Sequence, residues 1–224
     1  EDVRQLSKIV NFGAAGGMGA ETFLSNMDEQ MREVMTELNP DAPLNEVMRQ
    51  ILDDWREQWN MHQYFQWVSK KTRGGRKFDY VHPWSGRKRG HVGYTDGCNL
   101  PFQGICADAF KAAAIEIMRE IELPPSYLNE QGIEIGALLH DEFMTMGPPE
   151  TVRRWAGRVK HLMCEAARQV MPDCGIRAGA EVTGTVWSKS GCSVEEFEVL
   201  HREGLRAEDY LRCKKKDKTL TLND

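Results

Sequence analysis

Residues 133–146 consist of two short apolar segments that flank a polar sequence at 140–142, His-Asp-Glu. Apolar segments of this length around a short polar turn predict two antiparallel strands. Residues 104–122 and 149–171, on either side of this pair, have the apolar spacing of long amphipathic helices. A sheet packed by such helices predicts an α+β fold, with the polar turn at one end of the sheet.

Other parts of the chain have weaker patterns. Helical apolar spacing predicts helices at 2–15, 20–38 and 44–68. Residues with strand preference at 78–82 and 90–94 predict a second hairpin. The first third of the chain is therefore expected to be helical, and the remainder to mix helices and strands.

Charge is unevenly distributed along the chain. The net charge of −5 argues weakly against a nucleic-acid partner. Between residues 70 and 89, however, eight basic residues are opposed only by Asp79. The eight are Lys70, Lys71, Arg73, Arg76, Lys77, Arg87, Lys88 and Arg89. A solvated basic loop and a surface for a polyanion are equally compatible with this cluster.

Composition also bears on the cellular compartment. No stretch approaches the roughly 18 consecutive apolar residues of a membrane span, and no secretory leader opens the sequence. None of the six cysteines forms a Cys-x-x-Cys pair, so we expect reduced structural thiols in a cytosol-like compartment. Because the sequence begins with Glu1 rather than methionine, we expect a processed chain or a piece of a longer one.

Arg4, Lys8 and Phe12 are spaced four residues apart and therefore share one face of the first expected helix. Two cations and an aromatic ring suit a nucleoside triphosphate, because the cations match the phosphates and the ring offers a flat surface to the sugar or base. The alternative is a surface helix with two ordinary cations and one core phenylalanine. Spacing alone favours that alternative.

The polar turn is a second candidate site. The tandem carboxylates of Asp141 and Glu142 repel each other unless a cation is present. Mg²⁺ suits them, because this ion is often held by one or two carboxylates together with substrate phosphates. An ordinary polar turn is an equal alternative.

Two amide side chains form a third candidate site. Asn99 and Gln103 lie at the expected entry of the helix at 104–122. Amides at such a position suit contacts with bases and sugars through a minor groove. Capping of the helix by either residue is the favoured alternative.

Taken together, these segments resemble the family A DNA polymerases, the bacterial polymerase I type. Each match is moderate by itself, but five occur in the family's order and with roughly its spacing over residues 1–190. The matching segments are Arg4 with 8–13 (KIVNFG), 85–89 (SGRKR), 99–111 (NLPFQGICADAFK), 139–142 (LHDE) and 184–187 (GTVW).

The resemblance implies a DNA-directed DNA polymerase that adds dNTPs to a primer 3′-hydroxyl by two-metal phosphoryl transfer. Two Mg²⁺ ions would be the cofactors, and primer–template DNA the partner. The implied organisation is a helical fingers subdomain at 1–70, a palm with an antiparallel sheet and packing helices at 71–190, and a charged extension at 191–224.

The resemblance also implies roles for single residues. Arg4 and Lys8 would bind the incoming triphosphate, with Lys8 also assisting the leaving group, and Phe12 would lie against the deoxyribose. Asp141 would hold the metal ions, with Glu142 near them in a lesser role. The implied DNA contacts are Asn99, Gln103, His140 and Arg87.

Three departures separate this chain from the family's pattern. The family's tyrosine is Gly16 here, and Thr95 stands where many members have an arginine. The second metal-binding aspartate has no counterpart in the chain. We therefore expect a second polypeptide to supply it, together with the upstream palm and thumb, in the cytoplasm of a bacterium or a phage-infected host.

Two other functions are compatible with the sequence. A single-subunit RNA polymerase shares the palm, but it typically has serine in place of Glu142 and tyrosine in place of Phe12. A non-catalytic DNA-binding or scaffolding subunit derived from a polymerase is the alternative from another class.

The charged tail beyond Trp187 is expected to be a solvated appendage rather than a partner-docking segment.

Overall fold

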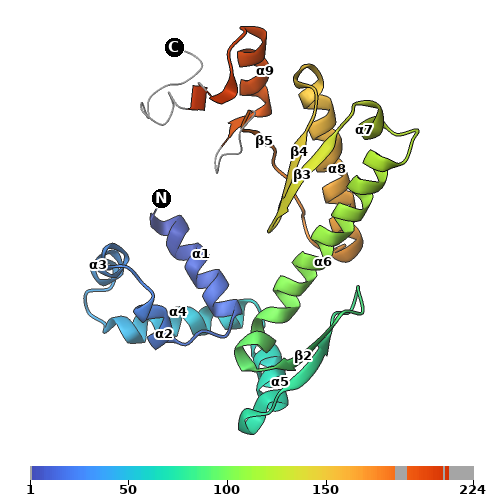
Figure 1. Ribbon diagram of the computed structural model, residues 1–224. Coiled ribbons are helices and arrows are strands. Elements are labelled where there is room, and N and C mark those ends of the chain that lie inside the picture. Colours follow the sequence, from blue (N-terminus) through green and yellow to red (C-terminus); the bar gives the residue numbers. More distant parts are fainter. Residues whose placement is uncertain (1, 185–190, 209, 212–224) are drawn as a thin grey trace. The chain divides into compact units, whose positions relative to one another are not determined.

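The computed structural model describes residues 2–184, 191–208 and 210–211 (Figure 1). Helices dominate this part of the chain. Its strands form three two-stranded antiparallel sheets. The predicted α+β fold is therefore confirmed.

The chain divides into two compact units, Glu1–Ile105 (unit 1) and Cys106–Asp224 (unit 2). The division falls inside helix α6 (Tyr94–Glu122). The expected functional boundaries near residues 70 and 190 stay predictions, because compactness does not define a fingers or a palm subdomain.

Unit 1 consists of helices followed by a short hairpin and the first turns of α6. Its elements before α6 are α1 (Asp2–Ala15), α2 (Ala20–Ser25), α3 (Glu29–Leu38), α4 (Leu44–Gln58), α5 (His62–Thr72), the 3₁₀ turn η1 (Arg73–Gly75), β1 (Phe78–Val81) and β2 (Lys88–Val92). The second hairpin is thus confirmed. Two of the expected helices are each divided into two.

A side-chain cap accounts for the first division and a left-handed backbone conformation for the second. The carboxylate of Asp28 accepts a hydrogen bond from the backbone N–H of Met31 at 2.8 Å, so it caps α3 and separates it from α2. Asn60 has a φ of +51°, a left-handed conformation that ends α4 before α5 begins. Apolar spacing continues through both breaks, which is why spacing alone predicted continuous helices at 20–38 and 44–68.

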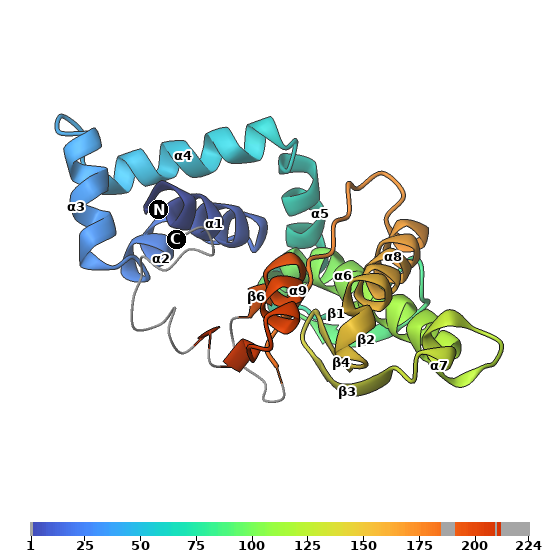
Figure 2. The same ribbon diagram turned by 90° about the horizontal axis from the view of Figure 1, so that it is seen from above.

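The core of unit 1 lies where α1, α2 and α3 pack around α4 (Figure 2). Phe23, Met48 and Leu52 are at most 1% exposed, and neighbouring methionines fill the space around them. The indole N–H of Trp55 donates a hydrogen bond to the Asn11 side-chain oxygen at 2.7 Å. This bond ties α1 to α4, and Ile9, Val10 and Ala14 are the α1 residues that face the core.

An aromatic cluster joins α5 to the hairpin and to α6. Trp67 on α5 contacts Phe78 on β1 edge-to-face, with ring centroids 5.6 Å apart. Tyr64, one turn earlier on α5, makes a similar contact with Phe102 on α6 at 5.6 Å. Such contacts are directional, so they fix the hairpin and α5 as one surface.

Helix α6 begins at Tyr94, ten residues before the expected start at residue 104. Pro101 lies inside it and has no N–H to offer the carbonyl of Gly97, four residues earlier. The hydroxyl of Tyr64 donates to that carbonyl, and it also lies 3.1 Å from the carbonyl of Cys98. The Tyr64 side chain therefore supplies the hydrogen bond that the Gly97 carbonyl cannot receive from Pro101. Burial raises the pKa of Tyr64, so its hydroxyl stays protonated as a donor.

Replacing Tyr64 with phenylalanine is expected to lower the free energy of unfolding by about 1–2 kcal/mol, because the Gly97 carbonyl would lose its donor. Tyr127→Phe is the matched control. The Tyr127 hydroxyl is buried and has no hydrogen-bond partner among the described residues, so its removal should be neutral or stabilising. Urea unfolding of the two variants measures the difference. Equal stability of both variants would contradict this account of α6.

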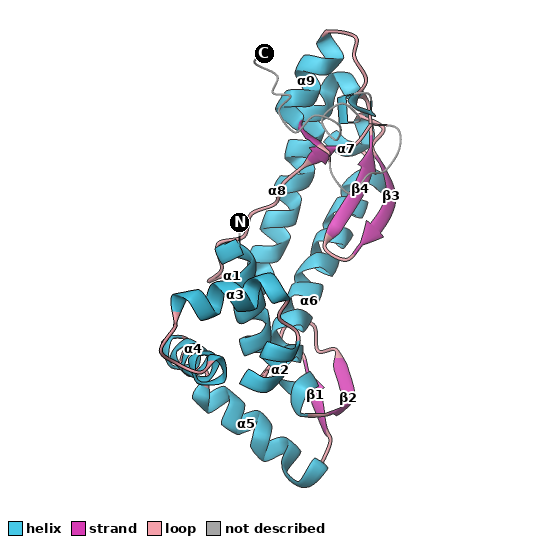
Figure 3. Ribbon diagram, turned by 90° about the vertical axis from the view of Figure 1, so that its left-hand side faces the viewer, coloured by secondary structure: helices cyan, strands magenta, loops and turns pink. Residues whose placement is uncertain are grey.

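Unit 2 contains the remainder of α6 and the hairpin with the polar turn (Figure 3). Its other elements are α7 (Tyr127–Glu130), β3 (Glu134–Leu139), β4 (Glu142–Met146), the 3₁₀ turn η2 (Pro149–Thr151), α8 (Val152–Val170), β5 (Glu181–Val182), β6 (Cys192–Ser193) and α9 (Val194–Arg202). The hairpin at 133–146 and the helices on either side of it are confirmed.

The core of unit 2 joins α6, α7 and α8 through Ile117, Leu128 and Val159. The guanidinium of Arg158 on α8 also makes a bidentate ion pair with Glu120 on α6, with N–O distances between 2.7 and 3.0 Å. Apolar packing and this ion pair hold the two long helices together behind the hairpin.

The segment after residue 190 folds onto unit 2. Ser193 caps α9 through a capping box with Glu196, and Val194 is buried in the same core as α6 and α8. The expectation of a solvated appendage is therefore wrong for the described part of this segment. Three residues of the expected closing motif, 185–187, lie outside the described residues.

Among the described residues, every helix falls short of the length or the apolarity that a membrane crossing needs.

Candidate functional site

The polar turn is a two-residue connection between β3 and β4. Leu139 and Glu142 are paired across the strands, so His140 and Asp141 form the turn itself. His140 has a φ of +54°, a conformation that costs a non-glycine residue about 1–2 kcal/mol. The side chains of His140, Asp141 and Glu142 are all exposed. The structure thus brings these three predicted site residues together.

Aromatic packing holds this turn in place. Phe143, next to Glu142, stacks on Phe110 of α6 with ring centroids 4.4 Å apart. Because successive side chains on a strand point to opposite faces, burial of Phe143 directs Glu142 away from α6. Ile135 on β3 also packs against the core. The carboxylates are therefore exposed on a firmly anchored hairpin.

Asp141 and Glu142 line a wide cavity of about 1350 Å³, together with the cationic side chains of Lys160 and Arg177. Exposed, adjacent carboxylate oxygens suit Mg²⁺ when substrate phosphates complete its coordination. Within the described residues no group of three or more His, Cys, Asp or Glu side chains forms a metal cluster. The donor set therefore fits part of a Mg²⁺ site.

The expected nucleotide-binding residues lie on α1 in unit 1. Lys8 is exposed, and Phe12 is 78% exposed, so Phe12 does not belong to the core. The alternative in which Phe12 is a core residue is wrong, because the α1 side chains that pack in the core are Ile9, Val10 and Ala14. Arg4 lies in α1, and its side chain is outside the described part of the structure. Proximity of these residues to Asp141, which belongs to unit 2, stays a prediction.

Asn99 and Gln103 lie within α6 rather than at its entry. The capping alternative is therefore wrong, because α6 already begins at Tyr94. Gln103 is exposed, whereas the Asn99 amide donates to the Thr95 carbonyl at 3.2 Å, one turn earlier in the same helix.

Gly16 passes close to Asn99, a proximity that the sequence did not reveal. A Cβ placed on Gly16 would lie 2.9 Å from the side-chain oxygen of Asn99. Gly17 has a φ of +72°, and a Cβ there would lie 2.9 Å from the sulfur of Cys98. The chain after α1 thus passes close to α6, and at Gly17 both the φ and the contact with Cys98 favour glycine. A side chain at position 16 would require the Asn99 amide to move.

Arg87, an expected DNA contact, is half-buried in the second hairpin. Its guanidinium donates to the carbonyl of Gly104 on α6 at 3.4 Å. A Cβ on Gly104 would lie 1.7 Å from the ring of His82, so this crossing also requires glycine. Arg87 therefore has at least a structural role in joining the hairpin to α6.

The rate at which each cysteine reacts with an alkylating reagent tests whether its side chain is buried or exposed. Cys98 and Cys192 are fully buried, whereas Cys106 and Cys174 are exposed. We expect alkylation of the native protein at Cys174 and Cys106 and protection of Cys98 and Cys192. Peptide mass spectrometry after a timed iodoacetamide pulse measures this pattern. Rapid labelling of Cys98 would contradict the close crossing of Gly17 over α6.

The two exposed cysteines should differ in rate. Partial burial of its sulfur atom raises the pKa of Cys106, and the nearby Cys174 and the Asp141 carboxylate raise this pKa further. A raised pKa lowers the thiolate fraction near pH 8, and the thiolate is the nucleophile. Alkylation of Cys106 should therefore be slower than that of Cys174, and the difference should shrink as the pH rises. Equal rates at pH 8 would argue against the placement of Asp141 beside Cys106.

No protein family, no curated protein and no solved structure matches this chain. Two candidate surfaces of the chain carry the motifs that resemble a polymerase active site, the turn at 140–142 and the exposed face of α1.

Proposed function

We propose that this chain supplies the C-terminal part of the active site of a DNA-directed DNA polymerase of family A type. The reaction is nucleotidyl transfer from a dNTP to the 3′-hydroxyl of a primer paired with a template. The observation that carries the proposal is the exposed pair Asp141 and Glu142 at a two-residue turn, anchored to α6 by the stacking of Phe143 on Phe110.

In the proposed reaction, the primer 3′-oxygen forms a bond to the α-phosphorus of the dNTP while the bond to pyrophosphate breaks. Asp141 would hold Mg²⁺ with Glu142 nearby, and such ions would supply positive charge at the primer hydroxyl and the phosphates. His140, next to Asp141 in the turn, contacts the primer end. The strained φ of His140 supports a functional role, because such strain is concentrated at functional sites.

The exposed face of α1 is proposed to bind the dNTP. Arg4 and Lys8 pair with the triphosphate, and Lys8 donates a proton to the leaving pyrophosphate. Phe12 packs against the deoxyribose, and its 78% exposure leaves the ring available for this contact. Binding here is charge-assisted, so it is expected to weaken as the salt concentration rises.

Primer–template DNA is proposed to contact Asn99, Gln103 and Arg87 along α6 and the second hairpin. Gln103 is exposed on α6 and needs no rearrangement to reach a minor groove. Asn99 is held between Thr95 and Gly16, so its amide has a fixed direction. A fixed amide suits the reading of base-pair geometry better than a mobile one.

A second polypeptide is proposed to supply the second aspartate. The described part of the β3–β4 sheet has two strands, and Leu138, Leu139 and Met146 on it are 44%, 40% and 54% exposed. Open sheet edges and exposed apolar residues favour the addition of a strand. An aspartate on such a strand would stand beside Asp141. The reduced cysteines agree with a cytoplasmic location for this complex, in a bacterium or a phage-infected host.

A non-catalytic DNA-binding subunit is the second candidate function. The crowding of Gly16 against Asn99 favours it, because the family's aromatic side chain has no space there. The two functions differ in their response to a nucleotide. A polymerase should bind primer–template DNA more tightly when the correct dNTP is present, whereas a scaffold should not respond to dNTP.

Native mass spectrometry of protein purified gently from its source tests the proposed assembly. We expect a mass well above the 25.6 kDa of this chain, and release of a different polypeptide on denaturation. That polypeptide should contain an aspartate whose removal abolishes primer extension. A lone 25.6 kDa species without affinity for any second polypeptide would contradict the proposal.

A further inference from the structure

Seven exposed cations gather on α5, η1 and the β1–β2 hairpin of unit 1. We call this surface the basic face. Its residues are Lys70, Lys71, Arg73, Arg76, Lys77, Lys88 and Arg89. None of the seven makes an ion pair with a carboxylate in the part of the chain that the structure describes. Mutual repulsion of unpaired cations is relieved when a polyanion binds.

The basic face is one surface because its elements are packed together. Trp67 on α5 contacts Phe78 on β1, and Tyr64 stacks on Trp67 with centroids 6.1 Å apart. Figure 1 shows α5 beside the hairpin. The pairing of Val81 with Lys88 places Lys88 and Arg89 at the start of β2, next to the hairpin turn. These packed elements fix the backbone positions from which the seven cations extend, and Lys88 and Arg89, as successive residues of β2, extend from opposite faces of the hairpin.

Aromatic side chains are exposed on the same elements. Trp84 lies in the hairpin turn between β1 and β2 and is 47% exposed, and Trp67 on α5 is 39% exposed. Exposed tryptophans among cations suit unpaired bases, because every base has a face that can stack on an aromatic ring. In a duplex the base faces are stacked on each other and are not accessible. This combination therefore favours a single strand over a duplex.

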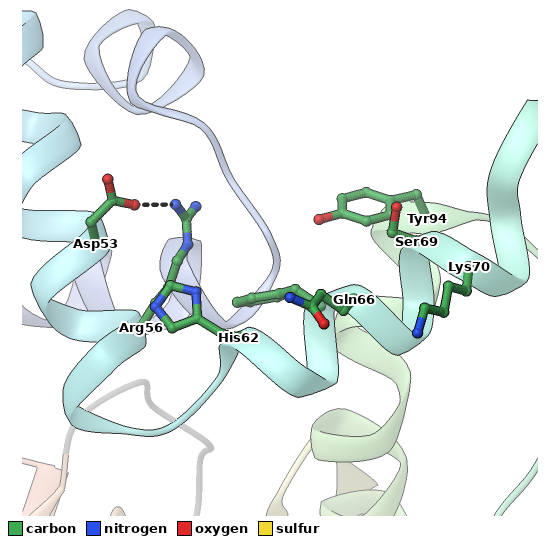
Figure 4. A pocket seen from close by; sticks show the side chains of 8 residues that line it. Asp53, Arg56, His62, Gln66, Ser69, Lys70 and Tyr94 are labelled. Carbon is green, nitrogen blue, oxygen red and sulfur yellow. Dashed lines mark hydrogen bonds and ion pairs between the residues drawn. The ribbon is translucent and has the colours of Figure 1, made fainter.

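A pocket of about 510 Å³ lies along α5 and meets the basic face at Lys70 (Figure 4). Arg56 and Tyr94 also line it. The Arg56 guanidinium bonds Asp53 at 2.9 Å and the carbonyl of Met18 at 3.0 Å, so it is held in position. Asp53 lines the same pocket and already pairs with Arg56, so Lys70 is the cation there that has no carboxylate partner among the described residues.

We propose that the basic face binds single-stranded nucleic acid through its phosphodiester backbone, with Trp84 stacking on a base. This inference is independent of the proposed polymerase function, because such binding requires neither Asp141 nor a second polypeptide. If both proposals hold, the basic face would contact the unpaired template strand. The negative net charge of the chain does not oppose it, since the cations are concentrated on one surface.

Fluorescence anisotropy of a labelled oligo-dT, titrated with the full chain, tests whether the cations of the basic face contribute to binding of the strand. A variant with Lys70, Lys71, Arg73 and Arg76 changed to Gln should bind at least about tenfold more weakly than the parent. The slope of log affinity against log salt should also decrease by about 0.7 for each phosphate that the variant no longer neutralises. The charge-matched control changes Arg49, Arg154, Arg168 and Arg202 to Gln, all of them exposed and remote in sequence from the basic face. An equal decrease of affinity in this control, or no decrease in the first variant, would overturn the proposal.

Trp84→Ala provides an independent test of base stacking. Its affinity for oligo-dT should fall about tenfold, whereas its affinity for a sugar–phosphate strand that lacks bases should match the parent's. Equal decreases for both strands, or equally tight parental binding of inorganic polyphosphate and oligo-dT, would overturn the assignment to nucleic acid. Asp141→Ala should bind oligo-dT as the parent does. Failure of strand binding is thereby distinguished from failure of catalysis.

Discussion

Replacing Asp141 with alanine is expected to reduce primer extension by the complete complex at least about a thousandfold, since the proposed reaction depends on metal ions that this carboxylate is proposed to hold. The reduction should appear in kcat rather than in the affinity for DNA. Asp141 is exposed in a two-residue turn, so its removal should change stability by no more than about 0.5 kcal/mol. Rapid-quench measurement of single-nucleotide addition gives the rate.

Two controls separate catalysis from charge in this experiment. Asp141→Asn keeps the size of the side chain and should be almost as inactive as Asp141→Ala, because an amide is a poor Mg²⁺ ligand. Glu134→Gln removes an exposed carboxylate from β3, opposite Met146 at the far end of the same hairpin, and should retain activity. Full activity of Asp141→Ala would exclude the proposed metal site.

The second large effect is expected for Lys8→Ala, which should slow nucleotide addition by about a hundredfold to ten-thousandfold. Its ammonium is proposed to bind the triphosphate and to protonate the pyrophosphate as it leaves. We expect a lower kcat together with a higher KM for dNTP, since both steps involve the same group. Single-turnover rates measured across dNTP concentrations separate the two effects.

Lys8→Arg should recover dNTP binding more fully than the rate, because arginine keeps the charge but is a poor proton donor. Arg49→Ala, which removes an exposed cation from α4 in the same unit, is the matched control and should behave as the parent. A Lys8→Ala variant with unchanged kinetics would favour the ordinary surface helix that spacing alone suggested.

The α+β fold could be predicted from the sequence because its long elements are defined by local patterns. The apolar residues at 133–146 and at 149–171 recur with the period of a strand and of a helix, respectively. Each period places its apolar side chains on one face, and burial of that face selects the type of secondary structure. The start of α6 could not be predicted. Pro101 indicates a helix end when it is considered alone, and the Tyr64 hydroxyl on α5, distant in sequence, supplies the hydrogen bond that Pro101 cannot give to the Gly97 carbonyl.

The candidate site could be predicted only in part. The sequence placed His140, Asp141 and Glu142 between two strands. The pairing of Leu139 with Glu142 confirms this for His140 and Asp141, whereas Glu142 is the first residue of β4. The close crossing of Gly16 over Asn99 joins distant segments, so no local pattern reveals it. Val194 was likewise expected in a solvated tail, because the charges of its neighbours hide one buried apolar face.

Primer extension by a mixture of this chain and its co-purified partner tests the central claim most directly. With Mg²⁺, a primer–template duplex and the four dNTPs, we expect extension to the end of the template by the mixture and none by either polypeptide alone. Extension should disappear when Asp141→Ala replaces the parent chain in the mixture. A mixture that binds DNA but adds no nucleotide would contradict the polymerase proposal and favour a DNA-binding subunit.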